Sequence, residues 1–433
     1  MSSVSTASTA AETVAPLVEG LFGADALLRV EFWDGSHLGP SVPPSPGTLR
    51  IRSADALRRM LWSPNELGLA RAYVAGDLDA EGDLFEMLHA MLRVARKGMR
   101  PGWSTLPGGI QAARRLGLFR RPLPPPPEEA RLRGGVHSLR RDAAAIGHHY
   151  DVGNDFYRIV LGPSMTYSCA RFSDEGMDLA AAQASKHELI CRKLGLPEQP
   201  GARLLDVGCG WGSMAIHAAL HHDVYVVGIT ISRSQADLAR KRAAEAGVGD
   251  RVDIRLQDYR ELGGEQFDAI SSIGMSEHVG SARLAEYYGI LHGALRPTGR
   301  LLNHAISSVG GSKIGRRSFI GRYVFPDGEL IDIGESVRAM EQAGFEVRDV
   351  ESLREHYAKT LRAWVANLEV GWNAAVALAG ERRARVWRLY MAASAVNFEA
   401  GRINVHQALG VVPTDEGSSG MPPTRRSWDA QPA

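Results

Sequence analysis

The sequence predicts an α/β fold built around a doubly wound, mostly parallel sheet, with a smaller domain before it. Apolar runs of strand length alternate with helix-spaced runs from residue 141 onward, and a glycine-rich turn follows the first strand. A proline-rich stretch separates this part from what precedes it. Such alternation is typical of a parallel sheet covered by helices on both faces. Ligands of these sheets bind beyond the carboxyl ends of the strands, so functional residues are expected there.

Six apolar runs have the length of strands, and two further runs have helical spacing. The expected strands are 203–207, 224–229, 252–256, 267–273, 300–305 and 346–350, and the expected helices are 234–246 and 282–295. Because the runs alternate along the chain, consecutive strands are expected to lie parallel, with the helices as crossovers.

Composition excludes several classes of protein. The chain has 433 residues, with 50 Lys and Arg against 49 Asp and Glu, and a formal net charge of +1. The length allows two or more domains, and the charge gives no overall case for nucleic acid as a partner. Cys169, Cys191 and Cys209 form no C-x-x-C pair, so neither a disulfide framework nor a cysteine zinc site is predicted, and no metal is expected. This cysteine usage indicates a reducing, cytoplasmic compartment.

The order of these features predicts five segments. They are a disordered tail at 1–14, an N-terminal accessory domain at 15–120, a Pro-rich linker at 121–140, the alternating domain at 141–410 and a second disordered tail at 411–433. Both tails are poor in apolar runs, and Pro122-Leu123-Pro124-Pro125-Pro126-Pro127 is typical of a stiff polyproline spacer. A signal peptide begins with a positively charged region, but residues 1–28 contain no Lys or Arg, so none is predicted. No apolar run reaches the length of a membrane span.

Alternating residues predict two strands in the accessory domain, at 27–32 and 48–52, with a hairpin turn at 33–36. Ser53 is the expected N-cap of the helix that follows. The end of the domain, 93–121, carries eight Lys and Arg and no acid, with aromatic and aliphatic residues between them. This pattern predicts peripheral attachment to an anionic membrane surface at the inner face of the membrane; a solvated linker is the alternative.

The glycine-rich turn reads Asp-Val-Gly-Cys-Gly-Trp-Gly at 206–212. Its glycines let the backbone approach a ligand where a Cβ would clash. The spacing is G-x-G-x-G, not the G-x-G-x-x-G of dinucleotide loops, and the Lys-Ser/Thr pair of a P-loop is absent. The turn is similar to that of S-adenosylmethionine (SAM) methyltransferases. Its alternative role is only to connect a strand with a helix.

The other strand ends carry polar residues suited to SAM. Thr230, Ser232 and Gln235 can hydrogen-bond a ribose, Asp258 can accept from the adenine amino group, and Tyr259 can stack on the base. A helix-surface position is the alternative for Gln235, and a cap or turn for Asp258. The full set of expected cofactor-binding residues is Tyr167, Ser168, Asp206, Gly208, Gly210, Thr230, Ser232, Gln235, Asp258, Tyr259 and Ile273.

Further motifs follow in a fixed order. They are H-Y-D-V-G-N-D-F-Y at 149–157, M-T-Y-S-C-A at 165–170, I-G-M-S-E-H-V-G at 273–280, R-Y-V-F-P-D-G at 322–328 and H-Y-A-K-T-L at 356–361. With D-V-G-C-G-W-G and T-I-S-x-x-Q, this set resembles the cyclopropane-fatty-acid synthase family, which includes mycolic acid cyclopropane synthases and fatty-acyl methyltransferases. The motifs span about 210 residues. Residues 15–120 resemble the accessory domain of the longer bacterial synthases more weakly.

The resemblance implies a class I SAM-dependent methyltransferase fold and transfer of a one-carbon unit to the cis double bond of a phospholipid acyl chain. An alkene needs no base to attack the sulfonium methyl group, but the resulting carbocation needs exclusion of water, electrostatic stabilisation and a proton acceptor. In the family the acceptor is taken to be bicarbonate. The residues expected to hold it here are Cys169, Glu277, His304, Ile306 through its backbone, and Tyr357. Taken separately, Cys169 could be a small buried hydrophobe, Glu277 could mark the start of a helix, and His304 could be a core histidine.

One position departs from the family pattern. The residue before Glu277 is usually a bulky aromatic and is Ser276 here. A smaller side chain could change the fate of the cation. Loss of a proton from the added methyl closes a cyclopropane ring, whereas loss from the chain or a prior hydride shift leaves a methylene branch, which is the precursor of a methyl branch.

Two other functions remain as alternatives at this point. One is a SAM methyltransferase for an O, N or S nucleophile of a small molecule, which would not need the motifs around Cys169 and Tyr357. The other is a lipid-binding protein without activity, against which the intact glycine turn argues. Double-bond position, head group and oligomeric state stay open, with a homodimer one of the alternatives.

Overall fold

The computed structural model describes residues 8–15, 28–39, 46–96, 106–130, 152–311, 315, 318–326 and 328–429, which form two compact units. The smaller unit contains the described residues of Met1–Ala130, Arg317–Val324 and Gly380–Val396. The larger unit contains those of Arg131–Arg316, Phe325–Ala379 and Asn397–Ala433. Two segments of the expected 141–410 domain therefore pack with the smaller unit, so this region is not one continuous unit.

The smaller unit has a four-stranded sheet in the order β2-β1-β3-β4. Its strands are β1 (Arg29–Phe32), β2 (His37–Leu38), β3 (Gly47–Ile51) and β4 (Leu78–Gly82). Its helices include α2 (Ala54–Trp62), α3 (Glu66–Ala75), α4 (Leu84–Arg96), α5 (Leu106–Arg115) and α13 (Phe319–Tyr323). The expected hairpin and both expected strands are present. Ser53 stands at the N-cap of α2, but its side chain makes no capping hydrogen bond, contrary to expectation.

Both termini differ from the expected disordered tails. Residues 10–15 are helical, and the backbone N–H groups of Ala10 and Ala11 donate to Asp34 and Ser36. At the other end, residues 412–429 are described, including α18 (Arg426–Asp429), and Trp428 is buried against the larger unit's core. A few buried apolar residues anchor these segments, which composition alone does not reveal.

The larger unit contains an eight-stranded sheet in the order β11-β12-β9-β8-β5-β6-β7, with β10 beside β9. The strands are β5 (Arg203–Val207), β6 (Tyr225–Thr230), β7 (Val252–Leu256), β8 (Phe267–Ile273), β9 (Leu295–Ser308), β10 (Ile331–Asp332), β11 (Glu346–Ser352) and β12 (Ile403–Val411). Strands β5 to β9 pair in parallel, whereas β12 runs antiparallel to β9 and β11. The chain order reverses between β5 and β8, which is where open α/β sheets bind ligands.

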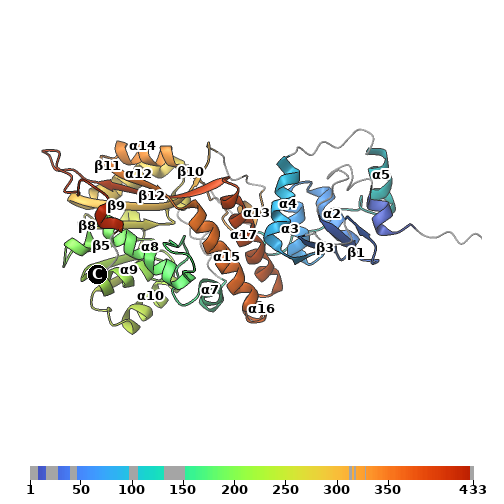
Figure 1. The fold of residues 1–433 in the computed structure, drawn as a ribbon, viewed down its shortest axis with the longest axis horizontal. Coiled ribbons are helices and arrows are strands. Elements are labelled where there is room, and N and C mark those ends of the chain that lie inside the picture. The colour runs from blue at the N-terminus through green and yellow to red at the C-terminus, as the bar shows by residue number, and fades with distance from the viewer. Residues whose placement is uncertain are drawn as a thin grey trace, which may run out of the picture. The chain divides into compact units, whose positions relative to one another are not determined.

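Helices cover both faces of this sheet (Figure 1). Helices α8 (Leu179–Leu194), α9 (Ser213–His222) and α10 (Arg233–Glu245) supply one core, and α12 (Leu284–Gly293) and α14 (Ile333–Gln342) supply the other. This unit also contains α7 (Asn154–Leu161), α11 (Ser276–Val279), α15 (Arg354–Val370) and α16 (Trp372–Ala379), whereas most of α17 (Glu381–Glu399) belongs to the smaller unit. The predicted doubly wound fold is confirmed, and β12 is the strand that sequence pattern missed.

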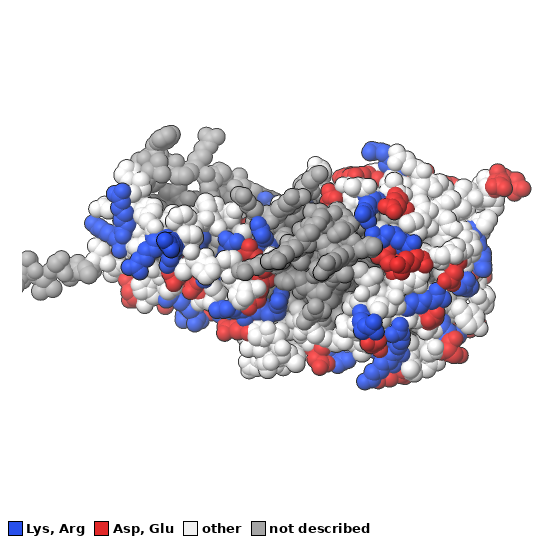
Figure 2. Space-filling view, turned by 180° about the vertical axis from the view of Figure 1, so that it is seen from behind, with Lys and Arg blue, Asp and Glu red and all other residues white. Residues whose placement is uncertain are grey.

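The face of the larger unit shown in Figure 2 has no single dominant charge. On the face shown in Figure 2, acidic and basic side chains are interspersed over the larger unit, in keeping with a net charge of +1. Among the described residues, no helix is long and apolar enough to cross a membrane.

Candidate active site

The glycine turn after β5 combines two different uses of glycine. Gly208 and Gly210 both have positive φ angles, +72° and +55°. A Cβ at Gly208 would lie 2.5 Å from the sulfur of Met275, so this glycine permits close packing. A Cβ at Gly210 would meet nothing within 4 Å, so this glycine keeps space open. The expected close approach of a ligand to the backbone is therefore available at Gly210.

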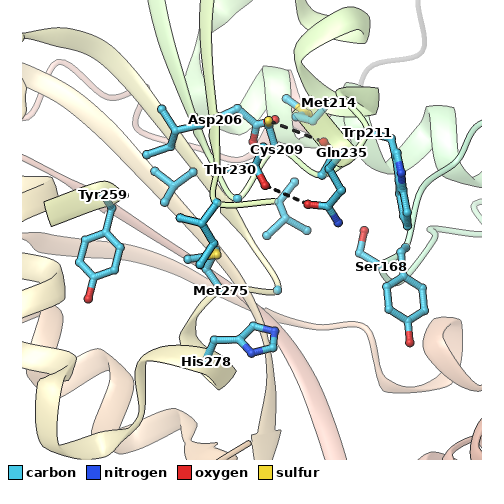
Figure 3. Close-up of a pocket in the computed structure, with 18 of the residues that line it drawn as sticks. Ser168, Asp206, Cys209, Trp211, Met214, Thr230, Gln235, Tyr259, Met275 and His278 are labelled. Atoms are coloured by element: carbon cyan, nitrogen blue, oxygen red, sulfur yellow. Dashed lines mark hydrogen bonds between the residues drawn. The ribbon is translucent and has the colours of Figure 1, made fainter. Parts of the chain in front are cut away.

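A cavity of about 160 Å³ lies at this turn. It is lined by the ends of four neighbouring parallel strands, β5, β6, β7 and β8, as the switch-point rule predicts. In Figure 3, Tyr259 lies on one side of the cavity and Trp211 and Ser168 lie on the other, with His278 below Met275. Every expected cofactor-binding residue except Ser232 lines it. Ser232 is instead the N-cap of α10, where its side chain accepts a hydrogen bond from the Gln235 backbone.

Asp206 is the acid at the start of the turn, near the end of β5. Its Oδ1 accepts a hydrogen bond of 2.8 Å from Ser271, whereas its buried Oδ2 has no hydrogen-bond partner in the part of the chain that the structure describes. Burial raises the pKa of the Asp206 carboxyl to about 6, against the lowering effect of the Ser271 hydrogen bond. The unpaired oxygen can therefore accept a hydrogen bond from a cationic ligand group.

The polar residues on the neighbouring strands are already hydrogen-bonded to one another. Thr230 donates to the Gln235 side-chain oxygen at 2.9 Å, which leaves the Gln235 amide nitrogen as a donor (Figure 3). Both oxygens of Asp258 accept from the Arg260 side chain at 2.7 Å. Burial would raise the pKa of Asp258, but the Arg260 hydrogen bonds hold it below its ordinary value. Asp258 therefore lines the cavity as a fixed carboxylate.

Aromatic side chains form the wall next to Ser168. The Trp211 indole N–H donates to Asn154 at 2.8 Å, and its ring lies 4.7 Å from that of Tyr157. The Tyr167 ring contacts Tyr157 and Trp364, with centroid distances of 5.7 Å and 5.3 Å. The motif at 149–157 therefore supports this wall through its second half, while residues 149–151 lie outside the described residues.

Two histidines of the cavity were not expected from the sequence. Burial lowers the pKa of His278 to about 4 and that of His187 well below its ordinary value. Both imidazoles are therefore neutral near pH 7, so they add no positive charge beside a cationic ligand. His278 directly follows Glu277 in the chain, and that adjacency was the one available signal for it.

Lys186 lies behind the cavity and was also missed. Its side chain is fully buried, and its ammonium group donates to the Ser168 hydroxyl at 3.0 Å. Burial lowers the pKa of Lys186 to about 7, opposed by attraction to Cys169 and Asp206. Lys186 thus supports two lining residues, Ser168 by a hydrogen bond and Asp206 by charge. A lysine in an amphipathic helix sequence is usually exposed, so pattern alone does not identify it.

The expected catalytic residues lie outside the cofactor cavity, and Glu277 is the best placed of them. Glu277 sits on α11 between Met275 and His278, which both line the cavity. The Ile306 backbone N–H donates to Glu277 Oε1 at 2.7 Å, so this amide orients the carboxylate. Its Oε2 is shielded from solvent and has no partner among the described residues. Burial raises the pKa of Glu277 to about 7.

His304 lies two residues before Ile306 on β9, so both side chains face the same side of the sheet. It is buried, and its Nδ1 lies 3.3 Å from the Gln407 side-chain nitrogen. Its Nε2 has no hydrogen-bond partner within the described ranges. Burial lowers the pKa of His304 well below its ordinary value, so the imidazole is neutral. Glu277 and His304 therefore each present one unpaired buried polar atom.

Of the other two expected residues, Cys169 lies beside the start of α15, and Tyr357 belongs to that helix. The Cys169 sulfur lies 3.2 Å from the Ala170 carbonyl and 3.6 Å from that of Leu353. Burial raises the pKa of the Cys169 thiol far above its ordinary value, so it is a neutral hydrogen-bond donor and not a nucleophile. The Tyr357 ring is buried against Trp364 and Phe398.

Ser276, where the family has an aromatic residue, points into the protein core. It is buried, and its hydroxyl donates to Asn303 at 2.8 Å. With Glu277 and Ile306 it lines a second cavity of about 10 Å³. That volume holds about one water molecule. The smaller side chain is therefore accommodated by a hydrogen bond and not by a large extra space.

Comparisons with known proteins show the family of this chain. Residues 137–408 match the family model described as mycolic acid cyclopropane synthetase. A probable fatty acid methyltransferase of Mycobacterium tuberculosis is 43% identical over 93% of this chain and 94% of its own length. The cyclopropane-fatty-acyl-phospholipid synthase of Escherichia coli is 33% identical over 84% of this chain and 88% of its own.

A solved structure extends the comparison to the fold. The mycolic acid cyclopropane synthase CmaA1, in a crystal structure described as complexed with SAH and CTAB, is 35% identical and superposes with a TM-score of 0.58. The match covers 62% of this chain and 97% of that one. The expected family and the class I SAM methyltransferase fold are confirmed, and the chain belongs to the mycolic acid cyclopropane synthetase family.

Proposed function

We propose that this protein is a SAM-dependent C-methyltransferase that transfers a methyl or methylene carbon to the cis double bond of unsaturated acyl chains of phospholipids. The observation that carries the proposal is the position of Glu277. The Glu277 carboxylate is buried, and one of its oxygens has no partner among the described residues. Its neighbours in sequence, Met275 and His278, line the SAM cavity, but the hydrogen bond from Ile306 holds Glu277 outside that cavity. An acid so placed serves a step other than cofactor binding.

SAM, when bound, supplies an electrophilic methyl group next to a positive sulfur. The residues of the cavity suit this charge, because Asp206 is acidic while His187 and His278 are neutral. Gly210 leaves room for the ligand along the backbone, and the aromatic wall around Trp211 excludes water. Exclusion of water protects the carbocation that alkene methylation produces.

We infer that bicarbonate is the proton acceptor, held by Glu277, His304, Cys169 and Tyr357. The donor set fits an anion of this kind, since Glu277 Oε2 and His304 Nε2 are buried without partners among described residues and Glu277 is half protonated near pH 7. Bicarbonate supplies a base small enough to reach a buried acyl chain. Ile306 acts on the bicarbonate site only by orienting Glu277, because its backbone N–H already donates to that carboxylate. The second cavity, with room for about one water, is too small for the anion.

Bicarbonate dependence is directly testable. Activity of the wild-type protein is measured in degassed, bicarbonate-depleted buffer and again after bicarbonate is added back. We expect activity to fall and recover, and Cys169→Ser, which weakens the anion site without removing it, to require more bicarbonate. Full activity of the wild type in depleted buffer would rule bicarbonate out.

We also infer that the smaller unit attaches peripherally to anionic membrane surfaces. Arg114, Arg115, Arg120 and Arg121 are all exposed. Among them lie exposed apolar side chains, with Trp62 49% and Phe119 52% accessible. The Trp62 indole N–H donates to the carbonyl groups of Leu118 and Arg120, so α2 and the end of the basic segment form one surface. Residues 97–105 of the segment lie outside the described residues.

Vesicle co-sedimentation tests the membrane contact. Changing Arg114, Arg115, Arg120 and Arg121 to Ser should weaken binding to anionic vesicles, by roughly 1 kcal/mol for each residue near the surface at low salt. The matched control changes four other exposed arginines, Arg233, Arg338, Arg382 and Arg402, to Ser. Equal loss in both variants would show that only net charge matters, and equal binding by wild type and test variant would leave the segment a plain linker.

The reaction itself is tested with methyl-labelled SAM and phospholipid vesicles. The protein is incubated with vesicles of cis-monounsaturated or fully saturated phospholipid, and the released acyl chains are analysed by mass spectrometry and NMR. We expect label only in the unsaturated chains, and NMR then distinguishes a cyclopropane from a methylene branch. Label in a head group, or transfer only to an O, N or S nucleophile, would overturn the proposed function.

A further inference from the structure

Four side chains with metal-binding donor atoms meet where α8 packs against α9, on the far side of the glycine turn. They are Glu188 and Cys191 on α8 and His217 and His222 on α9. The candidate ligand atoms of Cys191, His217 and His222 all lie within 4.8 Å of one another. No short sequence motif connects these residues, since the two helices are separated by β5. The described lining of the SAM cavity includes none of the four, so the cluster is separate from that site.

We propose that this cluster is a binding site for a divalent transition-metal ion of the zinc type, with Cys191, His217, His222 and Glu188 as ligands. One thiolate, two imidazoles and a carboxylate are all donors that Zn²⁺ binds in proteins. Four protein ligands complete a tetrahedron, which is typical of a structural site and not of a catalytic one.

The separations of the donor atoms suit this geometry. Glu188 Oε2 lies 2.8 Å from His222 Nε2 and 3.4 Å from His217 Nε2. A tetrahedron with metal–ligand bonds of about 2.0–2.1 Å has edges of about 3.3–3.4 Å. Small side-chain rotations therefore bring the three atoms to ligand positions around a common centre, with the buried Cys191 sulfur closing the site from the core side.

The surroundings of the cluster also resemble a built site. The Arg192 side chain donates to the second oxygen of Glu188 at 2.7 Å, which fixes the carboxylate as outer-shell partners of metal ligands do. The side chains of His217 and His222 are only 13% and 10% exposed, and Glu188 is 27% exposed, so the site is enclosed but has a path to solvent. A metal ion here would join the end of α9 to α8. Because α9 begins at Ser213, directly after the glycine turn, it would also stabilise the support of that turn.

Metal binding is measured on the full-length protein after treatment with a chelator, in a buffer with a phosphine reductant. Zn²⁺ is added in competition with a chromophoric chelator, and the zinc content is determined by elemental analysis. We expect one zinc ion per chain and a higher melting temperature with zinc. Co²⁺ in place of Zn²⁺ should give a sulfur-to-cobalt charge-transfer band. Failure to retain zinc against the chelator would overturn the proposal and leave Glu188 as the hydrogen-bond acceptor of two histidines.

Variants distinguish this site from adventitious binding. His222→Ala and Cys191→Ala should weaken zinc binding by more than the about 10–100-fold typical of outer-shell changes, whereas His221→Ala, a histidine on the same helix outside the ligand set, should not. Cys191 is buried, so if Cys191→Ala fails to fold, the partly accessible His222 provides the test. Zinc affinity unchanged in His222→Ala, or a Co²⁺ complex of the wild type without a thiolate band, would contradict the proposed ligands.

Discussion

The SAM cavity and the two buried residues Glu277 and His304 outside it differ in how their polar groups are hydrogen-bonded. In the cavity, the side chains of two pairs, Thr230–Gln235 and Asp258–Arg260, are hydrogen-bonded to each other, and Asp206 Oδ2 has no partner among the described residues. Outside the cavity, Glu277 Oε2 and His304 Nε2 are also buried without a partner in the described structure. Buried polar atoms without partners are costly, so they are expected where a ligand or a reaction uses them. Under the proposed function, the unpaired oxygen of Asp206 serves the binding of SAM, whereas the unpaired atoms of Glu277 and His304 serve the reaction.

The strongest disruption of the cavity should come from Gly210, a glycine of the turn after β5 whose Cβ direction is open. Gly210→Val places a branched side chain where a Cβ meets nothing within 4 Å, in the space proposed for SAM. We expect SAM binding to fall below detection in calorimetry while the protein remains folded. Gly247→Val is the matched control, since Gly247 also has positive φ and an open Cβ direction but lies after α10, away from the cavity.

Both glycine variants carry a similar backbone strain of about 1–2 kcal/mol, so their melting temperatures should fall together. Only Gly210→Val should lose SAM. Retention of normal SAM affinity by Gly210→Val would remove the turn from the binding site, and loss in both variants would attribute the effect to strain.

Two buried lysines on α8 differ in their expected roles, since one supports the SAM cavity and the other stabilises the fold. The Lys193 ammonium lies 2.9 Å from Asp349 and also contacts Glu351, whereas Lys186 has only the Ser168 hydroxyl as a hydrogen-bond acceptor among described residues. Lys193→Met should lower the free energy of unfolding by about 3 kcal/mol, because it leaves Asp349 buried with one partner fewer. Lys186→Met should cost little stability, since it removes a buried cation that lacks an acid in contact.

Lys186→Met should instead weaken SAM binding by about tenfold, the equivalent of one lost hydrogen bond that positions the cavity wall at Ser168. Denaturant unfolding and SAM calorimetry on both variants give the two numbers. The reverse pattern, with Lys186→Met unstable and Lys193→Met deficient in SAM binding, would contradict the assignment of Lys186 to the cavity.

The local parts of this structure were predictable from the sequence. Strands β5, β7 and β8 lie where the apolar runs indicated, and the residues at their ends line the cavity because short-range pattern decides both. Ser232 does not line the cavity but caps α10, because a hydroxyl at a strand end suits an N-cap as well as a ribose.

What sequence pattern missed depends on contacts distant in the chain. The strand β12 pairs with β9 about a hundred residues earlier, and its mixed polar and apolar residues resemble no regular strand. Lys186 is buried only because Ser168 and Asp206 come from other segments. The cluster of Cys191 and His222 likewise exists only once α8 and α9 pack. Tertiary contacts of this kind leave no periodic signal.

The pH dependence of the two sites should also differ. With a pKa near 7, Glu277 becomes ionised over the neutral range, so the rate of methyl transfer should rise with pH, reach half its maximum near pH 7 and level off about one pH unit higher. The rate of Glu277→Gln should not rise with pH in this way. Lys186 also has a pKa near 7, so it could cause the same rise. If Glu277 is responsible, the rate of Lys186→Met should still rise with pH. If the rise with pH disappears in Lys186→Met and remains in Glu277→Gln, the titrating group is the lysine.

Stability should change with pH in the opposite direction. Folded Glu277 keeps its proton to about pH 7, whereas the unfolded chain loses it near 4.5, so the folded state binds the extra proton between these values. The contribution of Glu277 to the free energy of unfolding is therefore complete below pH 4.5 and is lost as pH rises through 7. Denaturant titrations at several pH values should show a shallower decline for Glu277→Gln.

The claim that SAM binding and the reaction use separate residues is tested most directly with Glu277→Gln. Its SAM affinity and its turnover are measured on the same preparation. We expect turnover to fall at least ~100-fold with SAM affinity unchanged, because the carboxylate serves the reaction and not the binding of the donor. Glu286→Gln, which removes an exposed acid on α12, is the control and should behave as wild type. Normal turnover of Glu277→Gln, or a loss of SAM affinity that accounts for its inactivity, would contradict the separation of the two sites.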